Sequence, residues 1–358
     1  MEKLLVFGYT LDMGGAEKAL CDTLNYLAND YEIDLYLLEK KGALLESIPK
    51  NVSVYQIKNN IFNYVLFRYI PFIRKLVINK IANKKDYKLA WGYMEGRSGT
   101  WVSDIKKDIK KYAWIHNDVE KYSIGISSKE AKKTYSNVTK VICVSKEAKD
   151  KFIRKYQIDE NKVLVIYNYI DEAIIKKKAK EYSVKNDVFT FVNVAKMRDQ
   201  KRQDRLVKAG IYLKEKGYKF QIQLIGDGPN LSKIKQMVLD NGVDDCIKVL
   251  GLKTNPYPYI KAGDYFVLSS YMEGYGIVIK EALCLKTKVI TTDVVGPREI
   301  LENGKYGIIV PNTDEDIIRI MEDVMKNKEK YAYLDIEMKK YRGDNEKIIN
   351  DTRNLFKM

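Results

Sequence analysis

The chain has 358 residues, with 63 Lys and Arg against 48 Asp and Glu, so its formal net charge is +15 at neutral pH. Hydrophobic residues make up 46% of it and charged residues 31%, a composition that excludes disordered and fibrous proteins. The length suits two α/β domains that can each bury a core. No apolar run is as long as a membrane-spanning helix, and the opening residues are typical of a strand rather than a signal peptide. We therefore expect a cytoplasmic protein.

The predicted elements of the first half run in the order strand, glycine loop, helix, strand. They are a strand at residues 4–7, a loop with Gly14 and Gly15, a helix at 16–27 and a strand near 33–38. A later strand ends at His116, the only histidine of the chain, and Asn117 follows it. A single histidine is more often structural than functional, so its position alone assigns it no role.

The segment from 58 to 88 concentrates positive charge, with eight Lys or Arg, one acid and several interleaved aromatic residues. After its proline, Phe72 and Leu76 fall at helical spacing, which allows an amphipathic helix with cationic margins. Nucleic acid, phosphorylated small molecules and an anionic membrane are the possible partners of such a charge. We expect the membrane surface here, and a solvated basic helix packed on the first domain is the alternative. The cations singled out are Arg68, Arg74, Lys75 and Lys80.

The second half repeats the same order of elements. Strands are predicted at 189–194 and 220–225 and near 248–250, 265–268, 288–291 and 307–310, with helical patterns such as 204–216 between them. Strands alternating with helices predict a parallel sheet covered on both faces. The expected fold class is therefore α/β, with two Rossmann-like domains whose ligands gather at the carboxyl ends of the strands.

A charged stretch at 176–185 separates the two halves, and we place the linker near 172–187. The first domain is expected to cover 1–172 and the second 173–339. The helix expected at about 340–358 packs back on the first domain. Two such domains facing each other would hold a substrate between them.

The most informative segment follows the strand that ends at Leu268. A glycine-bearing loop leads to a helix that begins near Gly276. Because the N–H groups at a helix start are unpaired and lie at its positive end, this turn suits a diphosphate. Glu281 lies on the apolar side of this helix, where a carboxylate needs a donor such as a ribose diol, and Glu273 precedes the helix. A capping Glu273 and an ordinary surface Glu281 are the alternative.

Three cations, Lys196, Arg198 and Lys201, follow the strand at 189–194 and suit two phosphates. A solvated basic loop is the alternative. The turn Gly226-Asp-Gly-Pro ends the next strand, but any strand-ending turn can carry glycines.

Residues 251–314 resemble the retaining glycosyltransferases of family four, which have the GT-B fold. Five motifs carry the resemblance: Asn255-Pro-Tyr-Pro-Tyr, Phe266-Val-Leu-Ser-Ser, Glu273-x7-Glu281, Gly296-Pro-Arg-Glu and Gly304-Lys-Tyr-Gly. It is most specific over 191–314 and extends weakly over nearly the whole chain. In that family the first glutamate of the pair contacts hydroxyls of the donor sugar and the second binds the ribose. The resemblance implies two Rossmann-like domains with parallel sheets facing across a cleft.

The resemblance also implies roles for other positions. Tyr275, Gly276 and Ile277 belong to the donor site, Gly226 lies near the nucleotide, and Gly15 lies against the donor phosphate and sugar. Lys201 keeps the usual lysine, whereas Lys196 replaces the usual arginine, so either Lys196 or Arg198 makes the main diphosphate contact. His116 is assigned with Glu273 to the reacting sugar, and Asn117 and Asn168 to the acceptor or the cleft.

We expect no metal and no cofactor, because no DxD-like pair stands convincingly at a strand end and cations can neutralise the leaving diphosphate. The four cysteines, Cys21, Cys143, Cys246 and Cys284, have no CxxC spacing and predict neither a disulfide nor a zinc site.

The expected function is retaining transfer of a hexose from a nucleotide-sugar, with uracil favoured over guanine, to a hydroxyl of a glycan or lipid-linked acceptor. This activity belongs to cell-surface polysaccharide synthesis on the inner face of the membrane. A glycoside hydrolase is disfavoured, since its two carboxyls lie about 5 to 9.5 Å apart, whereas Glu273 and Glu281 would lie about 12 Å apart if the whole element were helical. A nucleotide-sugar epimerase, a sugar phosphorylase and a basic nucleic-acid-binding protein are the alternatives; the last does not explain the phosphate turn.

Overall fold

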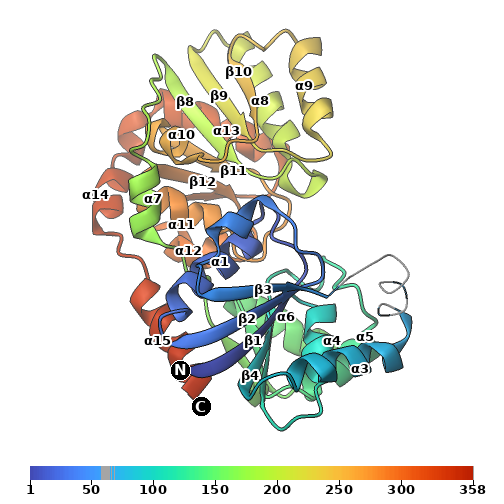
Figure 1. The fold of residues 1–358 in the computed structure, drawn as a ribbon. Helices are drawn as coiled ribbons and strands as arrows, with labels where there is room; N and C mark the ends of the chain where they lie inside the picture. Colours follow the sequence, from blue (N-terminus) through green and yellow to red (C-terminus); the bar gives the residue numbers. More distant parts are fainter. Residues whose placement is uncertain (58–64, 66, 68, 358) are drawn as a thin grey trace. The chain divides into compact units, whose positions relative to one another are not determined.

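The computed structural model describes residues 1–57, 65, 67 and 69–357 (Figure 1). The chain forms two compact units. The first unit holds Met1–Tyr169 and the C-terminal segment from Asn345, and the second unit holds Ile170–Asp344. The division thus falls just before the segment expected to be a linker. That segment begins with a helix of the second unit, α7 (Glu172–Lys178), because Asp171 caps it and Ile175 is buried.

In the described residues, the first unit has a seven-stranded sheet with the order β3-β2-β1-β4-β5-β6-β7. Every neighbouring pair is parallel (Figure 1). The strands are β1 (Glu2–Gly8), β2 (Tyr31–Leu37), β3 (Val52–Gln56), β4 (Tyr87–Gly92), β5 (Lys110–Ile115), β6 (Lys140–Cys143) and β7 (Val163–Val165). The helices are α1 (Gly15–Leu27), α3 (Pro71–Ala82), α4 (Arg97–Ser103), α5 (Ser128–Ser136), α6 (Lys146–Tyr156) and α15 (Asn345–Lys357).

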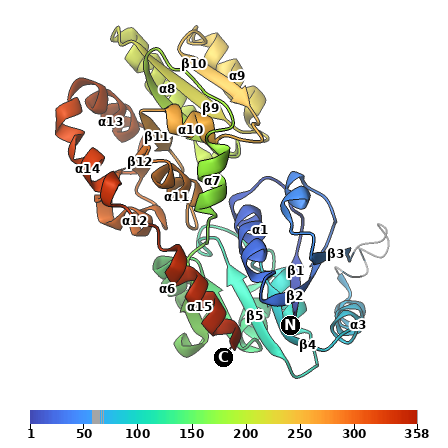
Figure 2. The ribbon, with the colours of Figure 1, turned by 60° about the vertical axis from the view of Figure 1, so that its left-hand side comes forward.

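The C-terminal helix α15 packs on the sheet of the first unit (Figure 2). Phe356 stacks on Tyr112 with ring centres 5.7 Å apart and meets the edge of Trp91. The Tyr112 hydroxyl donates to the carbonyl of Leu355 over 2.7 Å. Burial of this aromatic cluster therefore fastens the end of the chain to the first unit.

The second unit has a six-stranded parallel sheet in the described residues, with the order β10-β9-β8-β11-β12-β13. The strands are β8 (Phe189–Val194), β9 (Phe220–Ile225), β10 (Ile247–Gly251), β11 (Tyr265–Leu268), β12 (Lys288–Thr292) and β13 (Ile308–Val310). The helices besides α7 are α8 (Gln203–Glu215), α9 (Leu231–Asp240), α10 (Tyr257–Ala262), α11 (Ile277–Cys284), α12 (Pro297–Ile300), α13 (Asp314–Lys326) and α14 (Tyr333–Lys340).

Both sheets reverse their strand order at an inner strand. The chain steps outward from β1 to β3 and then returns beside β1 with β4; in the second unit it steps from β8 to β10 and returns beside β8 with β11. Loops diverge at such a switch point, and ligands of doubly wound sheets bind there, at the carboxyl ends of the strands. Each unit is thus Rossmann-like, which confirms the predicted fold class.

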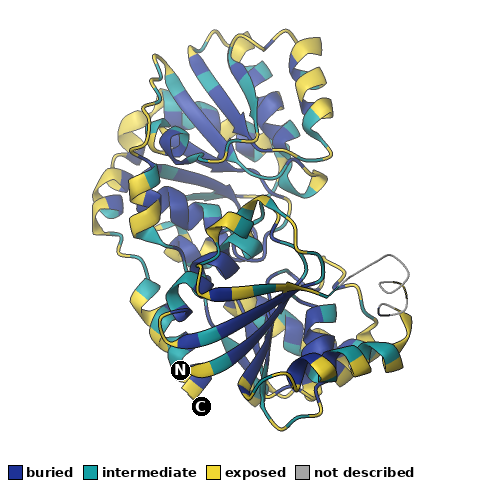
Figure 3. Ribbon diagram, in the orientation of Figure 1, coloured by how far each residue is buried: buried dark blue, intermediate teal, exposed yellow. Residues whose placement is uncertain are grey.

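Each sheet is buried between helices whose outer faces are exposed (Figure 3). The helix α13 shows how the sequence produces this arrangement. Thr313 caps it by accepting from the N–H of Asp316. Acidic side chains in its first turn stabilise the helix, because they lie at the positive end of its dipole. Its apolar side chains fall on one face, which is buried: Ile317, Ile320, Met321 and Val324.

No helix in the described ranges has the length and apolar character needed to cross a membrane. The four cysteines are free thiols. Burial raises the pKa of the Cys21 thiol to about 12, as expected of a cysteine that serves as a small apolar side chain.

Candidate functional site

The loops that follow β8 and β11 meet at the switch point of the second unit. The N–H of Tyr271 donates to the carbonyl of Gln200 over 2.8 Å, and the Gln200 side chain donates to the carbonyl of Met272 over 3.0 Å. The Ser269 hydroxyl donates to the carbonyl of Lys201 over 3.0 Å. These bonds join two loops that are about 70 residues apart in sequence into one polar surface.

Glu273 lies in this surface and is only 6% exposed. Its Oε1 receives the Lys201 amine at 2.5 Å and the Ser270 hydroxyl at 2.6 Å. Its Oε2 has no hydrogen bond to any residue that the structure describes. The lysine balances the charge of the carboxylate, and one oxygen remains able to accept hydroxyl protons from a ligand.

Glu281 lies in the second turn of α11 and is also 6% exposed. The Tyr257 hydroxyl donates to its Oε1 over 3.1 Å. The apolar side of α11 is buried, as predicted, so Glu281 is a carboxylate held inside the unit by a phenol. Sequence reasoning missed both Ser270 and Tyr257, although each lies within a quoted motif, because a motif does not say which side chains touch.

Two glycines shape the turn before α11. Gly276 is left-handed, with φ +86°, and directly precedes the helix. Gly296, with φ +85°, lies against the backbone of Tyr275; a Cβ on Gly296 would come within 2.4 Å of the Tyr275 Cα. The turn predicted to hold a diphosphate therefore keeps its shape because the loop that contains Gly296 can pack directly against its backbone.

The three predicted phosphate-binding cations differ in their surroundings. Lys196 is half-buried, Arg198 is exposed, and Lys201 is paired with Glu273. Lys201 therefore shares the site with a carboxylate, and its predicted contact with the donor stays a prediction.

A buried cation that the sequence did not predict binds the loop after β11. Arg205 is buried and donates to Asp314 over 2.8 Å and to the carbonyl of Ser269 over 3.1 Å. Burial opposes ionisation of Asp314, but hydrogen bonds from Lys208 and Arg205 outweigh it and lower its pKa to about 2. This network fixes the loop after β11.

Gly226 closes the turn after β9 against the loop after β8. Gly226 has a φ of +146°. A Cβ on Gly226 would lie 2.0 Å from the carbonyl oxygen of Ala195, so only glycine fits. The N–H of Met197 donates to the carbonyl of Asp227 over 2.9 Å. The turn thus holds the backbone that carries Lys196.

His116 follows β5 in the first unit and is 6% exposed. Its Nε2 lies 2.8 Å from the carbonyl oxygen of Tyr93, whereas its buried Nδ1 has no partner among the described residues. A carbonyl only accepts, so Nε2 carries the proton and Nδ1 is left as an acceptor. Burial lowers the pKa of His116, which keeps the ring neutral at neutral pH.

A buried carboxylate, Glu95, orders the residues around this histidine. Its Oε2 accepts from the backbone N–H of His116 over 3.0 Å, and its Oε1 accepts from the side chain of Asn117. The Tyr9 hydroxyl donates to the backbone carbonyl of Glu95 over 3.0 Å. Sequence reasoning missed Glu95; an acid in the short loop after β4 was the available signal. Asn168, in the loop after β7, is buried.

The predicted glycine loop begins α1 of the first unit. Gly15 is the first helical residue, and Gly14 caps the helix without a side chain. The Glu17 carboxylate folds back over this start, since a Cβ on Gly14 would lie 2.2 Å from its Oε2. A carboxylate from the same helix therefore lies beside the glycine loop that the resemblance assigns to the donor.

Three of the predicted membrane-facing residues, Arg74, Lys75 and Lys80, lie in α3. Lys75 and Lys80 are exposed, and Phe72 and Leu76 are 70% and 57% exposed. Arg74 instead donates to Asp104 over 2.7 Å and is mostly buried, which corrects the expectation that it presents its charge to a membrane. Arg68 lies outside the described residues.

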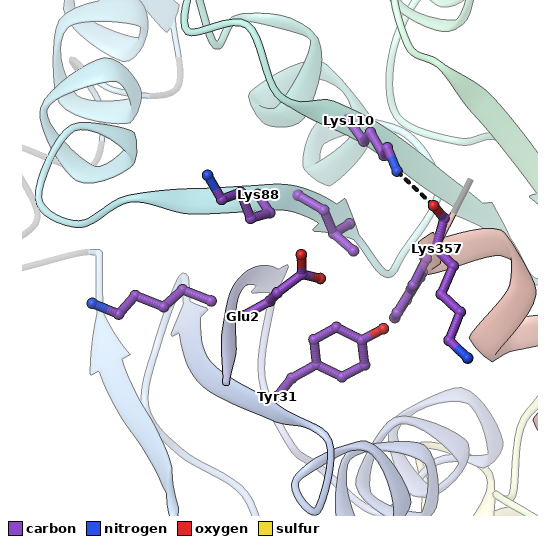
Figure 4. A pocket seen from close by; sticks show the side chains of 8 residues that line it. Glu2, Tyr31, Lys88, Lys110 and Lys357 are labelled. Carbon is purple, nitrogen blue, oxygen red and sulfur yellow. Dashed lines mark hydrogen bonds between the residues drawn. The ribbon is translucent and has the colours of Figure 1, made fainter.

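A cavity of about 260 Å³ lies at the amino-terminal ends of strands in the first unit's sheet (Figure 4). It is lined by the first residues of several strands and by α15: Glu2, Lys3, Tyr31, Lys88, Leu89, Lys110, Phe356 and Lys357. The Lys110 amine donates to the carbonyl of Lys357 over 3.1 Å. The cavity therefore lies away from the carboxyl ends of the strands, where His116 follows β5 and the glycine loop follows β1.

The described residues contain no group of three or more His, Cys, Asp or Glu placed to hold a metal ion. The polar groups assembled at the strand ends are instead carboxylates held by lysine, serine and tyrosine in the second unit, and a neutral histidine in the first.

Comparison with known families covers almost the whole chain. Residues 13–173 match the family described as Glycosyltransferase Family 4, and residues 174–341 match the family described as Glycosyl transferases group 1. The border between the two matches lies within four residues of the border between the two units.

Two relatives illustrate the sequence similarity. The chain is 24% identical over 334 residues, 88% of each chain, to the Campylobacter jejuni protein named N-acetylgalactosamine-N,N'-diacetylbacillosaminyl-diphospho-undecaprenol 4-alpha-N-acetylgalactosaminyltransferase. It is 27% identical over 242 residues to an uncharacterized glycosyltransferase of Methanocaldococcus jannaschii. That second match covers 61% of this chain and 60% of the relative, so the chain spans less than two thirds of that relative's length.

Among solved structures, HepE of Anabaena in complex with UDP and glucose matches with a TM-score of 0.81 and 19% identity over 100% of both chains. At this identity the likeness shows the shared fold.

Proposed function

The chain belongs to the GT-B glycosyltransferases of the family 4 type, and from this premise we propose that it transfers a hexose, with retention, from a UDP-sugar to a glycan or lipid-linked hydroxyl. The observation that carries the proposal is the pair of buried carboxylates at the start of α11. Glu273 accepts from Lys201 and Ser270, and Glu281 accepts from the hydroxyl of Tyr257.

The donor fits this site along its length. The diphosphate lies at the start of α11, the positive end of the helix dipole, with Lys196 and Arg198 beside it. The ribose diol donates to Glu281 inside the unit. The sugar then lies beyond the terminal phosphate, where the Oε2 of Glu273 accepts from its hydroxyls.

Transfer breaks the bond between the anomeric carbon and the diphosphate and forms a bond from that carbon to the acceptor oxygen on the same face. The proton of the acceptor hydroxyl goes to an oxygen of the departing diphosphate. The protein holds the two reactants together and stabilises the charge that develops on the leaving group, a task for the cations and the helix start. We propose that no metal is required for this.

We also propose roles for groups of the first unit toward the sugar and the acceptor. The neutral His116 offers Nδ1 as an acceptor, which suits a sugar hydroxyl and disfavours an ionised phosphate oxygen, since neither partner would then have a proton to donate. Asn117 and Asn168 are assigned to the acceptor.

A lipid-linked acceptor requires the enzyme to meet a membrane surface. The name of the Campylobacter relative specifies a diphospho-undecaprenol acceptor. On α3 the side chains of Phe72 and Leu76 are exposed beside Lys75 and Lys80, so apolar groups and cations share one helix face. Each cation near an anionic surface contributes about 1 kcal/mol. We place the protein peripherally on such a surface through α3.

A panel of nucleotide-sugars tests the donor assignment. A ligand that binds the native state raises its melting temperature by mass action, and we expect UDP-sugars to do so more than GDP-sugars. The donor found in this way is then incubated with a lipid-linked acceptor and a chelator, and the anomeric configuration of the product is determined by NMR. Transfer with retention supports the proposal; donor conversion without an acceptor would show an epimerase instead.

A further inference from the structure

The segment Asn255–Tyr259, at the start of α10, contains one of the sequence motifs, but the proposed function gives the motif no role of its own. Tyr257 is only 5% exposed, and its hydroxyl donates to Oε1 of Glu281 over 3.1 Å. These two residues lie 24 positions apart on different helices, α10 and α11. The contact therefore comes from the packing of the two helices and not from local sequence.

Several segments hold the backbone of this tyrosine in place. The Asn255 side chain accepts from the N–H of Tyr257 over 3.2 Å and donates to the carbonyl of Lys178 over 2.8 Å and to Glu181 over 2.7 Å. Prolines precede and follow Tyr257 and restrict the backbone there. Its ring is thus presented to α11 from a rigid base.

A phenol directed at a buried carboxylate has two effects. It satisfies one oxygen of a charged group that would otherwise lack solvent, and it restricts rotation of the carboxylate about its last bond. A ribose diol needs a carboxylate in a fixed orientation to accept from adjacent hydroxyls, so the tyrosine sets the geometry that the ribose meets.

We propose that Tyr257 is a positioning residue of the donor site: it orients Glu281 for the ribose hydroxyls without touching the nucleotide. This inference rests on the proposed function, because it requires a nucleotide at α11. It also gives the Asn255–Tyr259 motif a role, as the base from which this orientation is imposed.

The test is calorimetric binding of UDP and of 2′,3′-dideoxy-UDP to wild type and to Tyr257→Phe, which loses only the hydroxyl. A hydrogen bond to a charged group corresponds to about tenfold in affinity or more. We expect Tyr257→Phe to bind UDP about tenfold more weakly than wild type does. We expect the variant and wild type to bind dideoxy-UDP with the same affinity. Tyr259→Phe is the matched control, since it removes a hydroxyl from the same motif and leaves Glu281 its partner.

Equal weakening of both nucleotides by Tyr257→Phe would indicate a general structural effect and would overturn the inference, as would unchanged UDP binding. A Glu281→Gln background provides a second check: there, adding Tyr257→Phe has no further effect if the tyrosine acts through Glu281, and an additive loss would contradict this. Wild type that binds UDP and dideoxy-UDP equally would refute the inference and leave the donor site standing. Wild type that binds no nucleotide would instead refute the proposed function itself.

Discussion

Glu273 and Glu281 are both buried carboxylates, yet their partners separate their expected roles. Glu273 is bound to a lysine from the loop after β8, where we propose the reacting sugar, whereas Glu281 is bound to a phenol inside the second unit. An interaction with the reacting sugar can strengthen in the transition state, whereas one with the ribose is the same before and during reaction.

We predict that Glu273→Gln lowers kcat by about 100-fold with a small change in donor Kd, while Glu281→Gln weakens donor binding by about tenfold with a smaller change in kcat. Steady-state kinetics and calorimetry separate these quantities. The exposed Glu215 on α8, changed to Gln, is the control. Near-wild-type kinetics in both variants would remove the carboxylates from the site.

The sole histidine gives a prediction about pH. Burial lowers the pKa of His116 in the folded state below its value of about 6.5 in the unfolded chain. The unfolded chain therefore binds the proton more readily, and this contribution to stability is present above about pH 6.5 and is lost as the pH falls.

We expect the free energy of unfolding to fall between pH 7.5 and 5.5 by at most about 1.4 kcal/mol per pH unit from this group, and His116→Gln to flatten that part of the curve. Denaturant unfolding at several pH values measures the change. Because the chain has a single histidine, NMR of the imidazole reports on His116 alone once any purification tag has been removed. The spectrum should show the proton on Nε2. A histidine that titrates at its ordinary pKa would contradict the assignment.

At the scale of elements, the turn before α11 depends on the loop before α12. Gly296→Ala would place a Cβ within 2.4 Å of the Tyr275 backbone and displace the turn. Gly217 also has a positive φ, +76° against +85°, but a Cβ there meets no atom within 4 Å. Both changes carry a similar backbone strain of about 1 kcal/mol.

We therefore predict that Gly296→Ala abolishes measurable UDP binding, whereas Gly217→Ala lowers the melting temperature slightly and leaves UDP binding intact. Calorimetry on the folded fraction of each variant decides this. Equal UDP affinity in the two variants would show that the turn does not hold the diphosphate.

The helix α3 offers a charge test of membrane docking. Lys75→Glu with Lys80→Glu reverses two exposed cations, and we expect it to reduce sedimentation with anionic vesicles by at least tenfold, from about 1 kcal/mol per cation. Lys129→Glu with Lys133→Glu on α5 makes the same change in net charge elsewhere and is the control. Equal loss in both double variants would indicate a general effect of charge and remove α3 as the docking surface.

The order of strands and helices could be predicted from the sequence because it depends on local periodicity. The strands at 220–225 and 265–268 lie where the apolar runs placed them. The burial of Glu281 also followed from helical spacing. The partners did not: Lys201 meets Glu273 across 72 positions, and Arg74 meets Asp104 across 30. Ion pairs of this kind depend on how elements pack, which periodicity does not specify.

Across the whole molecule, two Rossmann-like units share one chain, and we assign them different tasks. The buried carboxylates and the turn before α11 belong to the second unit, to which we therefore assign the nucleotide. The neutral histidine and the exposed face of α3 belong to the first, which is given the acceptor and the membrane.

Hydrogen–deuterium exchange with and without saturating UDP tests this division of tasks, because it reports on every described element at once. We predict the largest protection at 195–202 and 269–281 in the second unit, with α3 and α5 unchanged. Protection confined to the first unit, with none at the start of α11, would contradict it.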